Sequence, residues 1–171
     1  AVDPDDKTII IYRELYRKGL TGDLLADTMT QLEEGELKSI PGVLDTSAWS
    51  RTGYTGPTIG EALVTRGHKL RRADKNRVAG KVQIHEHLRL KQETGRPRLQ
   101  IFNSCLNLIR ELQSIPMSST NSEDVDTHAS DHAYDALRYL VMSRPRLDHP
   151  YDRMLRLKED TYRPVDGTFG Y

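Results

Sequence analysis

The sequence of 171 residues has little of several features by which protein classes are recognised. It contains one cysteine, Cys105, which excludes an intrachain disulfide framework and favours a reducing compartment. No apolar run approaches the length of a membrane span, and the first residues do not resemble a signal peptide. There is also no glycine-rich phosphate loop and no internal repeat. We therefore expect a soluble, intracellular protein that has no membrane partner, and any nucleotide-driven motor must lie on other residues.

The charged residues show a local bias but no overall one, because 25 Lys and Arg balance 25 Asp and Glu. The most basic stretch is 68–77, H-K-L-R-R-A-D-K-N-R. Such a cluster can position a nucleic-acid backbone by neutralising phosphates without reading the sequence. A solvated strand and turn would explain the same residues equally well. The cations that we assign to DNA binding are Arg71, Arg72, Lys75 and Arg77.

Strand-like and helix-like segments alternate along the chain, which predicts an α/β domain with helices covering a mostly parallel or mixed sheet. The length suits one domain, which we place at 1–143, followed by a tail or linker at 144–171. Apolar and β-branched runs predict strands at 8–16, 42–46 and 98–103. Apolar periodicity and capping residues predict helices at 21–34, 58–67, 76–94, 104–115 and 130–142.

The most informative stretch is 130–142, S-D-H-A-Y-D-A-L-R-Y-L-V-M, which sets two aspartates and a histidine on one edge of an apolar helix. Helical spacing makes Asp131 and His132 neighbours of Asp135. With Ser130 as N-cap, Asp135 falls in the second turn, beyond the reach of the helix dipole, and metal coordination would explain it. Asp131 is equally explained as a helix-start residue, and His132 as a surface histidine or a partner of Asp135.

A further acidic residue, Asp45, directly follows the short apolar run G-V-L. Metal ligands of sheet proteins recur at such strand ends, although most aspartates there are turn residues. We expect Asp45 and Asp135 to meet at one edge of the sheet. Two carboxylates without a basic partner repel each other, and Mg²⁺ or Mn²⁺ would relieve this. Two such ions would activate a water and stabilise the leaving oxygen in phosphodiester cleavage.

Six ordered segments occur within residues 2–142: Y-R-E-L-Y, G-V-L-D-T-S-A-W-S, I-G-E-A-L, R-A-D-K-N-R, P-R-L-Q-I-F and D-H-A-Y-D-A-L-R-Y. Together they resemble the C-terminal nuclease domain of tailed-bacteriophage terminase large subunits. The resemblance implies an RNase H-like fold, a mixed β-sheet flanked by helices, and a metal-dependent endonuclease that cuts concatemeric double-stranded DNA during genome packaging. It also implies the terminase ATPase domain, the small terminase subunit and the portal as partners, and a location in the host cytoplasm, transiently on the procapsid.

Residue by residue, the resemblance makes Asp45 the second acidic ligand of the family and Asp135 the third. His132 matches a histidine that some members place three residues before that aspartate, and Asp131 is a further candidate ligand. The implied catalytic residues are therefore Asp45, Asp135 and His132, and the implied ligands of the Mg²⁺ or Mn²⁺ pair are Asp45, Asp135 and Asp131. Lys75 and Arg77 match a basic segment that faces DNA.

The chain departs from the family pattern at its beginning. The family's first catalytic aspartate lies in an initial strand, upstream of a turn like D-P-D-D at 3–6, and this chain starts at that turn. The first strand and its carboxylate are thus absent from these residues, and we expect the sequence to cover part of a longer polypeptide.

Two other functions are compatible with the sequence. The first is a non-catalytic RNase H-like module that docks DNA or the portal through its basic cluster. The second is a metabolic α/β enzyme in which Asp131, His132 and Asp135 serve small-molecule chemistry. The lack of a phosphate loop and of a Ser or Cys nucleophile motif counts against the second.

Overall fold

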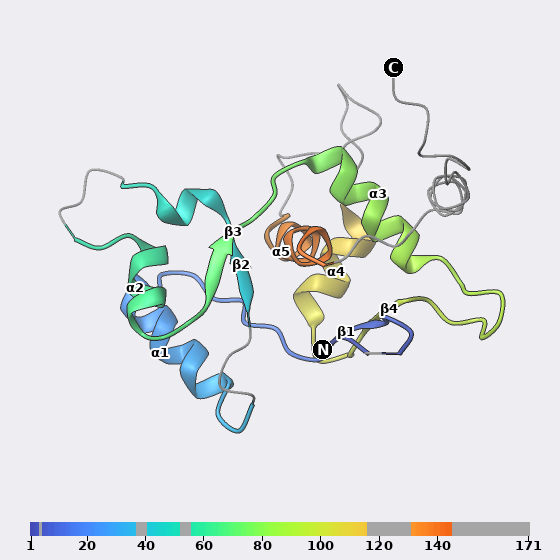
Figure 1. Ribbon diagram of the computed structural model, residues 1–171, viewed down its shortest axis with the longest axis horizontal. Helices are drawn as coiled ribbons and strands as arrows, with labels where there is room; N and C mark the ends of the chain where they lie inside the picture. Colours follow the sequence, from blue (N-terminus) through green and yellow to red (C-terminus); the bar gives the residue numbers. More distant parts are fainter. Residues whose placement is uncertain (4, 37–40, 52–55, 116–130, 145–171) are drawn as a thin grey trace, which may run out of the picture.

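Helix α5 (His132–Met142) lies in the middle of the protein, as a computed structural model shows (Figure 1). The structure describes residues 1–3, 5–36, 41–51, 56–115 and 131–144. Helix α5 contacts α3 (Arg77–Leu88), α4 (Leu106–Ser114) and strand β2 (Gly42–Leu44). The last predicted helix is therefore the element against which α3, α4 and β2 pack. The tail predicted at 144–171 lies outside the described residues except for Arg144.

The strands in the described part of the chain are short and form two separate parallel pairs. Strand β1 (Ile9–Ile11) pairs with β4 (Leu99–Ile101), and β2 pairs with β3 (Leu70–Arg72). The predicted α/β class is confirmed, but among the described residues the strands make two small sheets rather than one mixed sheet. The strand predicted at 8–16 is correct only over 9–11, because its partner leaves the ladder after Phe102 and turns into α4.

The remaining elements lie on the side of the β2–β3 pair (Figure 1). Helix α1 (Gly22–Leu32) packs against α2 (Ile59–Thr65), and the 3₁₀ turn η1 (Thr46–Trp49) also contacts α2. Thr21 and Thr58, the first residues of two predicted helices, are N-caps, since each side chain accepts a hydrogen bond from the third N–H group of its helix. None of the helices in the described ranges is long and apolar enough to cross a membrane.

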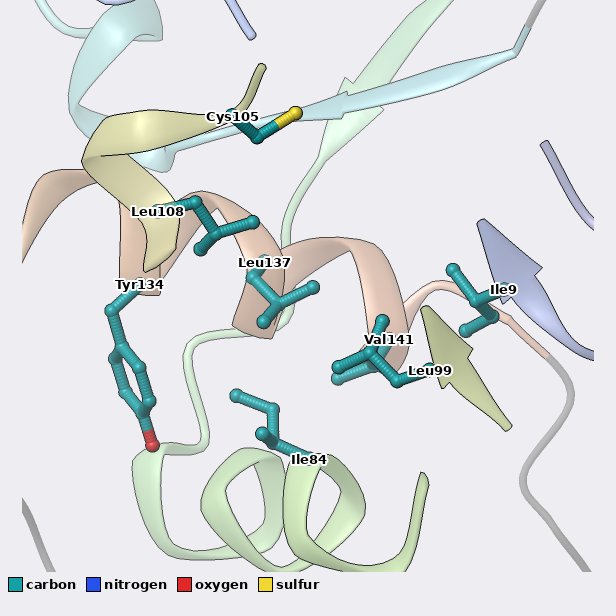
Figure 2. Packing of buried hydrophobic residues seen from close by; sticks show 8 residues of the cluster. All are labelled: Ile9, Ile84, Leu99, Cys105, Leu108, Tyr134, Leu137 and Val141. Carbon is teal, nitrogen blue, oxygen red and sulfur yellow. The ribbon is translucent and has the colours of Figure 1, made fainter. Parts of the chain in front are cut away.

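The main hydrophobic core lies between α5, α3, α4 and the β1–β4 pair (Figure 2). Helices α3 and α4 pack on α5, which brings apolar side chains from five elements and the α4 N-cap into one cluster. The buried members of this cluster are Ile9, Ile84, Leu99, Cys105, Leu108, Tyr134, Leu137 and Val141. The single cysteine is thus a packing residue, 0 % exposed.

Glutamates from elsewhere in the chain cap the N-termini of α4 and α5. Glu14, in the segment after β1, accepts hydrogen bonds of 3.1 and 2.7 Å from the first N–H groups of α4. Glu111, on α4 and 1 % exposed, accepts hydrogen bonds of 2.7 and 3.0 Å from the first N–H groups of α5. Helix N-termini leave unpaired N–H groups and favour negative charge there. These two carboxylates therefore fix how α4 and α5 start relative to the rest of the fold.

Helices α3 and α5 approach closely at Gly80, where the stem of Arg138 crosses α3. A Cβ at Gly80 would lie 2.3 Å from Arg138 Cγ and 2.7 Å from its Cδ. Arg138 is 2 % exposed, so its side chain has no open space into which to move. The absence of a side chain at Gly80 is therefore what allows the guanidinium to pass.

Gly80→Ala should destabilise the protein, although the same change raises helix propensity by about 1 kcal/mol in an exposed helix. We expect the free energy of unfolding in urea to fall by about 1–3 kcal/mol, because the new methyl group overpacks the contact with Arg138. Val82→Ala on the same helix, where the side chain is 53 % exposed, should change it by less than about 0.5 kcal/mol. A more stable Gly80→Ala protein would contradict this account of the α3–α5 contact.

Candidate functional site

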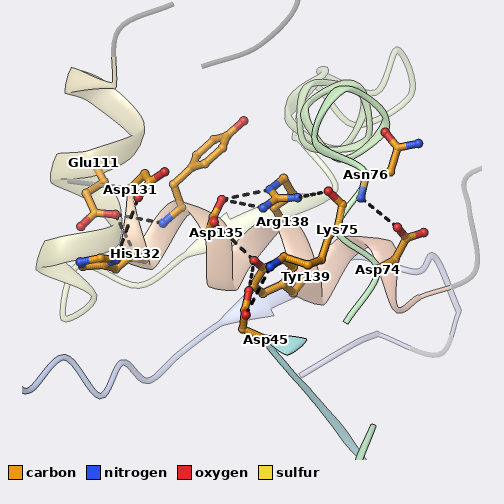
Figure 3. A network of polar contacts seen from close by, with 12 residues as sticks. Asp45, Asp74, Lys75, Asn76, Glu111, Asp131, His132, Asp135, Arg138 and Tyr139 are labelled. Carbon is orange, nitrogen blue, oxygen red and sulfur yellow. Dashed lines mark hydrogen bonds and ion pairs between the residues drawn. The ribbon is translucent and has the colours of Figure 1, made fainter. Parts of the chain in front are cut away.

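The structure brings Asp45 and Asp135 to a single hydroxyl group (Figure 3). The Tyr139 hydroxyl donates a hydrogen bond to Asp45 Oδ2, and its oxygen lies 3.4 Å from Asp135 Oδ2. The side chains of Asp45 and Asp135 are 30 % and 23 % exposed, so both carboxylates are accessible from solvent. Two acidic residues 90 positions apart in the sequence thus share one small site.

Strand geometry places Asp45 there. It follows β2 directly and starts η1, with Oδ1 accepting a 2.6 Å hydrogen bond from Ser47 N. A 2.9 Å bond from Ala73 N to Leu44 O continues the β2–β3 ladder to the same end. The segment after β3 therefore arrives beside Asp45, at the carboxyl ends of parallel strands where α/β proteins place their ligand sites.

Both carboxylates have basic partners, so the premise that they meet without one is wrong. Lys75 Nζ lies 3.5 Å from Asp45 Oδ1. Arg138 Nη2 and Nε donate hydrogen bonds of 2.8 and 3.1 Å to Asp135 Oδ1. Arg138 is three residues after Asp135 on the helix, and Lys75 reaches Asp45 through the β2–β3 register. Lys75 and Arg138 therefore neutralise part of the negative charge of the two carboxylates.

The reason given for metal binding by Asp135 also needs correction. Helix α5 begins at His132, with Asp131 at the N-cap position, so Asp135 is in the first turn and not the second. The predicted N-cap, Ser130, lies outside the described residues. The helix dipole alone does not account for the position of Asp135. Its side chain also accepts a hydrogen bond from Arg138 and lies near the Tyr139 hydroxyl.

The pKa values of Asp45 and Tyr139 are shifted in opposite directions. Burial raises the pKa of Asp45, but hydrogen bonds from Tyr139 and Ser47 and the charge of Lys75 outweigh burial and hold that pKa far below its usual range. Burial, the hydrogen bond to Asp45 and the charge of Asp135 raise the pKa of Tyr139 far above the usual range. At neutral pH Asp45 is therefore ionised, and Tyr139 keeps its proton and acts as a donor.

Asp131 and His132 lie at the start of α5, away from Asp45 (Figure 3). Burial and the charge of Asp135 raise the pKa of Asp131. The side chain of His132 is 75 % exposed, with Nδ1 4.0 Å from Asp131 Oδ1. Within the described residues, no hydrogen bond or ion pair joins His132 to Asp45 or Asp135. The structure therefore does not bring His132 to the carboxylate pair.

His132 instead borders a large groove. The groove has a volume of about 860 Å³ and lies between residues 10–19 and α5, with Met29 and Leu32 of α1 at one side. Its lining is largely apolar and includes neither Asp45 nor Asp135. We do not assign it to the carboxylate site.

Of the predicted DNA-binding cations, Lys75 contacts the carboxylate site, and the other three have contacts elsewhere. Arg71 donates a 2.9 Å hydrogen bond to the backbone oxygen at the end of α5. The Arg72 guanidinium lies 5.7 Å from the centre of the Trp49 ring. Arg77 is half-buried, and its charge acts on Asp131. Within the described residues, Lys75 is therefore the predicted DNA-binding cation that lies against Asp45.

Asp45 and Asp135 are two partly exposed carboxylates that could contribute to a metal site. No group of three or more His, Cys, Asp or Glu side chains able to hold a metal was found in the part of the chain that the structure describes. Magnesium sites commonly use one or two carboxylates and complete their coordination with water and substrate phosphates. The pair fits that pattern, since both carboxylates are partly exposed and both lie beside the Tyr139 hydroxyl.

Sequence reasoning missed Arg138 and Tyr139, the two residues that organise the site. They stand three and four positions after Asp135, and this spacing was a usable signal because it places them on the same helix face. The residues next to them in the sequence are apolar, so the pattern indicates only that this part of the helix faces the core. Comparisons of the chain with protein-family models, with curated proteins and with solved structures gave no match.

Asp45→Asn should lower stability at neutral pH more than at acidic pH. A carboxyl whose pKa is depressed by folding from the unfolded value of 3.8 stabilises the folded state above that value, and loses this contribution as the pH falls towards the folded pKa. The difference in unfolding free energy between the wild-type protein and the variant should therefore shrink between about pH 5 and pH 3 in urea titrations. Asp27→Asn, at a 56 % exposed position, is the control with a smaller effect. A difference independent of pH would contradict the assignment.

Proposed function

We propose that this chain is the nuclease domain of a phage DNA-packaging terminase, a metal-dependent endonuclease that cuts concatemeric double-stranded DNA. The observation that carries the proposal is the convergence of Asp45 and Asp135 on the Tyr139 hydroxyl at the carboxyl end of β2. The ordered motifs that resemble this family place an acidic ligand at both positions. The ATPase domain, the small terminase subunit and the portal are the partners that go with this function.

The arrangement of the elements supports an RNase H-like organisation in part. An acidic residue ends one of two adjacent parallel strands, and a second acidic residue comes from the last helix. In the parallel β2–β3 ladder, the backbone N–H and C=O groups of Gly42 and Leu44 point towards β3. Those of Val43 therefore point to the opposite edge of β2. In the proposed fold, the strand that carries the family's first carboxylate pairs at that edge and extends β2–β3 into the mixed sheet.

Each residue of the site has a separate role in the proposed reaction. Asp45 and Asp135 would hold Mg²⁺ or Mn²⁺, which when bound would supply activation of water and stabilisation of the leaving oxygen in phosphodiester hydrolysis. Tyr139 fixes one oxygen of Asp45 by hydrogen bonding and so leaves a defined direction for the other. Arg138 holds Asp135 from the buried side. The basic side chains along the same edge bind the DNA backbone.

A plasmid-nicking assay tests this function. With Mn²⁺ the protein should convert supercoiled plasmid to the open circle, and chelation by EDTA should stop the reaction. Asp45→Asn and Asp135→Asn should each reduce nicking by at least about a hundredfold, because each removes a direct ligand of the cation.

The matched control is Asp27→Asn, the same chemical change on the exposed face of α1. It should nick like the wild-type protein. Circular dichroism melting of all variants separates lost chemistry from lost folding. Full activity in a folded Asp45→Asn or Asp135→Asn protein would contradict the proposal.

A non-catalytic module that docks DNA or the portal is the second candidate. It is favoured by one observation, that Lys75 and Arg138 already balance the charges of Asp45 and Asp135. This function predicts salt-sensitive DNA binding that weakens when Arg71 and Arg72 are changed to Glu, with no metal-dependent nicking. The same plasmid assay, combined with a salt titration of binding, distinguishes the two functions.

A further inference from the structure

The backbone of Lys75 is fixed by hydrogen bonds, whereas its side chain is half exposed and makes a long ion pair with Asp45. Its carbonyl oxygen accepts a 3.3 Å hydrogen bond from buried Arg138, and the next residue, Asn76, caps α3 through a 3.0 Å bond from Ala79 N. The Lys75 side chain is 52 % exposed. The ammonium group can therefore leave Asp45 without moving β3 or α3.

The contact between Lys75 and Asp45 is loose compared with the other contacts of the site. Its N–O distance is 3.5 Å, whereas Arg138 reaches Asp135 at 2.8 Å and is 2 % exposed. Exposed ion pairs of this kind are weak and are screened by salt. Within the described residues, Asp45 thus has one partner that can be displaced, Lys75, and two that stay in place, Tyr139 and Ser47 N.

We propose that Lys75 is an internal counter-ion that competes with the divalent cation for Asp45 and thereby sets the affinity of the site for that cation. This inference rests on the proposed function in taking Asp45 as a cation ligand. An ammonium group 3.5 Å from the ligand oxygen repels a cation that binds there, so the cation binds only as Lys75 swings into solvent. Lys75 is accordingly a positioning residue and not a catalytic one.

The test is a Mn²⁺ titration followed by electron paramagnetic resonance of the free ion, without DNA and without any measurement of cleavage. Lys75→Met removes the charge and keeps a side chain of similar length. We expect Mn²⁺ to bind this variant about tenfold more tightly than the wild-type protein at low salt. Since salt screens the ammonium group, the gain should be smaller at high ionic strength.

Two control variants separate charge from shape and location. Lys75→Arg keeps the charge and should bind Mn²⁺ like the wild-type protein. Lys69→Met makes the same chemical change at an exposed position just before β3 and should also leave the affinity unchanged. Adding Asp45→Asn to Lys75→Met should abolish the gain, which assigns it to Asp45.

The outcomes distinguish this inference from the function on which it rests. If the wild-type protein binds Mn²⁺ in an Asp45-dependent way but folded Lys75→Met binds equally or more weakly, the role of Lys75 is wrong and the metal site remains. If neither protein binds Mn²⁺ at millimolar concentrations, the proposed function and this inference are both wrong. If Lys75→Met and Lys69→Met both bind Mn²⁺ more tightly, the proposed role of Lys75 is also wrong. The gain would then come from the lower net positive charge of the protein and not from the contact with Asp45.

Discussion

The structure depends on the burial of one charged group, the guanidinium of Arg138. A charge removed from water must be paired and hydrogen-bonded, or it destabilises the fold by several kcal/mol. Arg138 meets this requirement with Asp135 on its own helix and with the backbone oxygen of Lys75 after β3, and its stem passes over Gly80 of α3. One side chain therefore connects α5, α3 and the β2–β3 pair, and it fixes the separation between the core and the carboxylate site.

Two buried or half-buried glutamates act in the same way at the helix starts. Glu111 connects α4 to the first turn of α5, and Glu14 connects the segment after β1 to α4. The α4–α5 contact is then defined both by apolar packing at Leu108 and Leu137 and by the direction of these hydrogen bonds. Because α5 supplies Asp135 and Tyr139, the caps far from the site also determine where the site forms.

The site contains opposite charges whose mobility differs. Arg138 is fixed on Asp135, whereas Lys75 rests loosely on Asp45 in solvent. The carboxylates could bind a divalent cation, and the Lys75 ammonium group could bind a DNA phosphate. This difference makes the same arrangement compatible with an enzyme and with a docking module. The nuclease remains the proposed function because two acidic residues from distant parts of the chain meet at the carboxyl end of parallel strands.

The amino-acid sequence alone determined the α/β class, the helices whose caps and apolar periodicity are local, and the position of Asp45 directly after a strand. These features follow from neighbours within a few residues. The sequence predicted that Asp45 and Asp135 meet, but their contact through Tyr139 depends on how α5 packs beside β2. Only the tertiary structure decided the lengths of the strands, the two-sheet arrangement, the burial of Arg138, and the contacts of Tyr139 and Lys75 with Asp45. Those features depend on which elements pack together, because a hydrogen bond between residues 94 positions apart has no local signal.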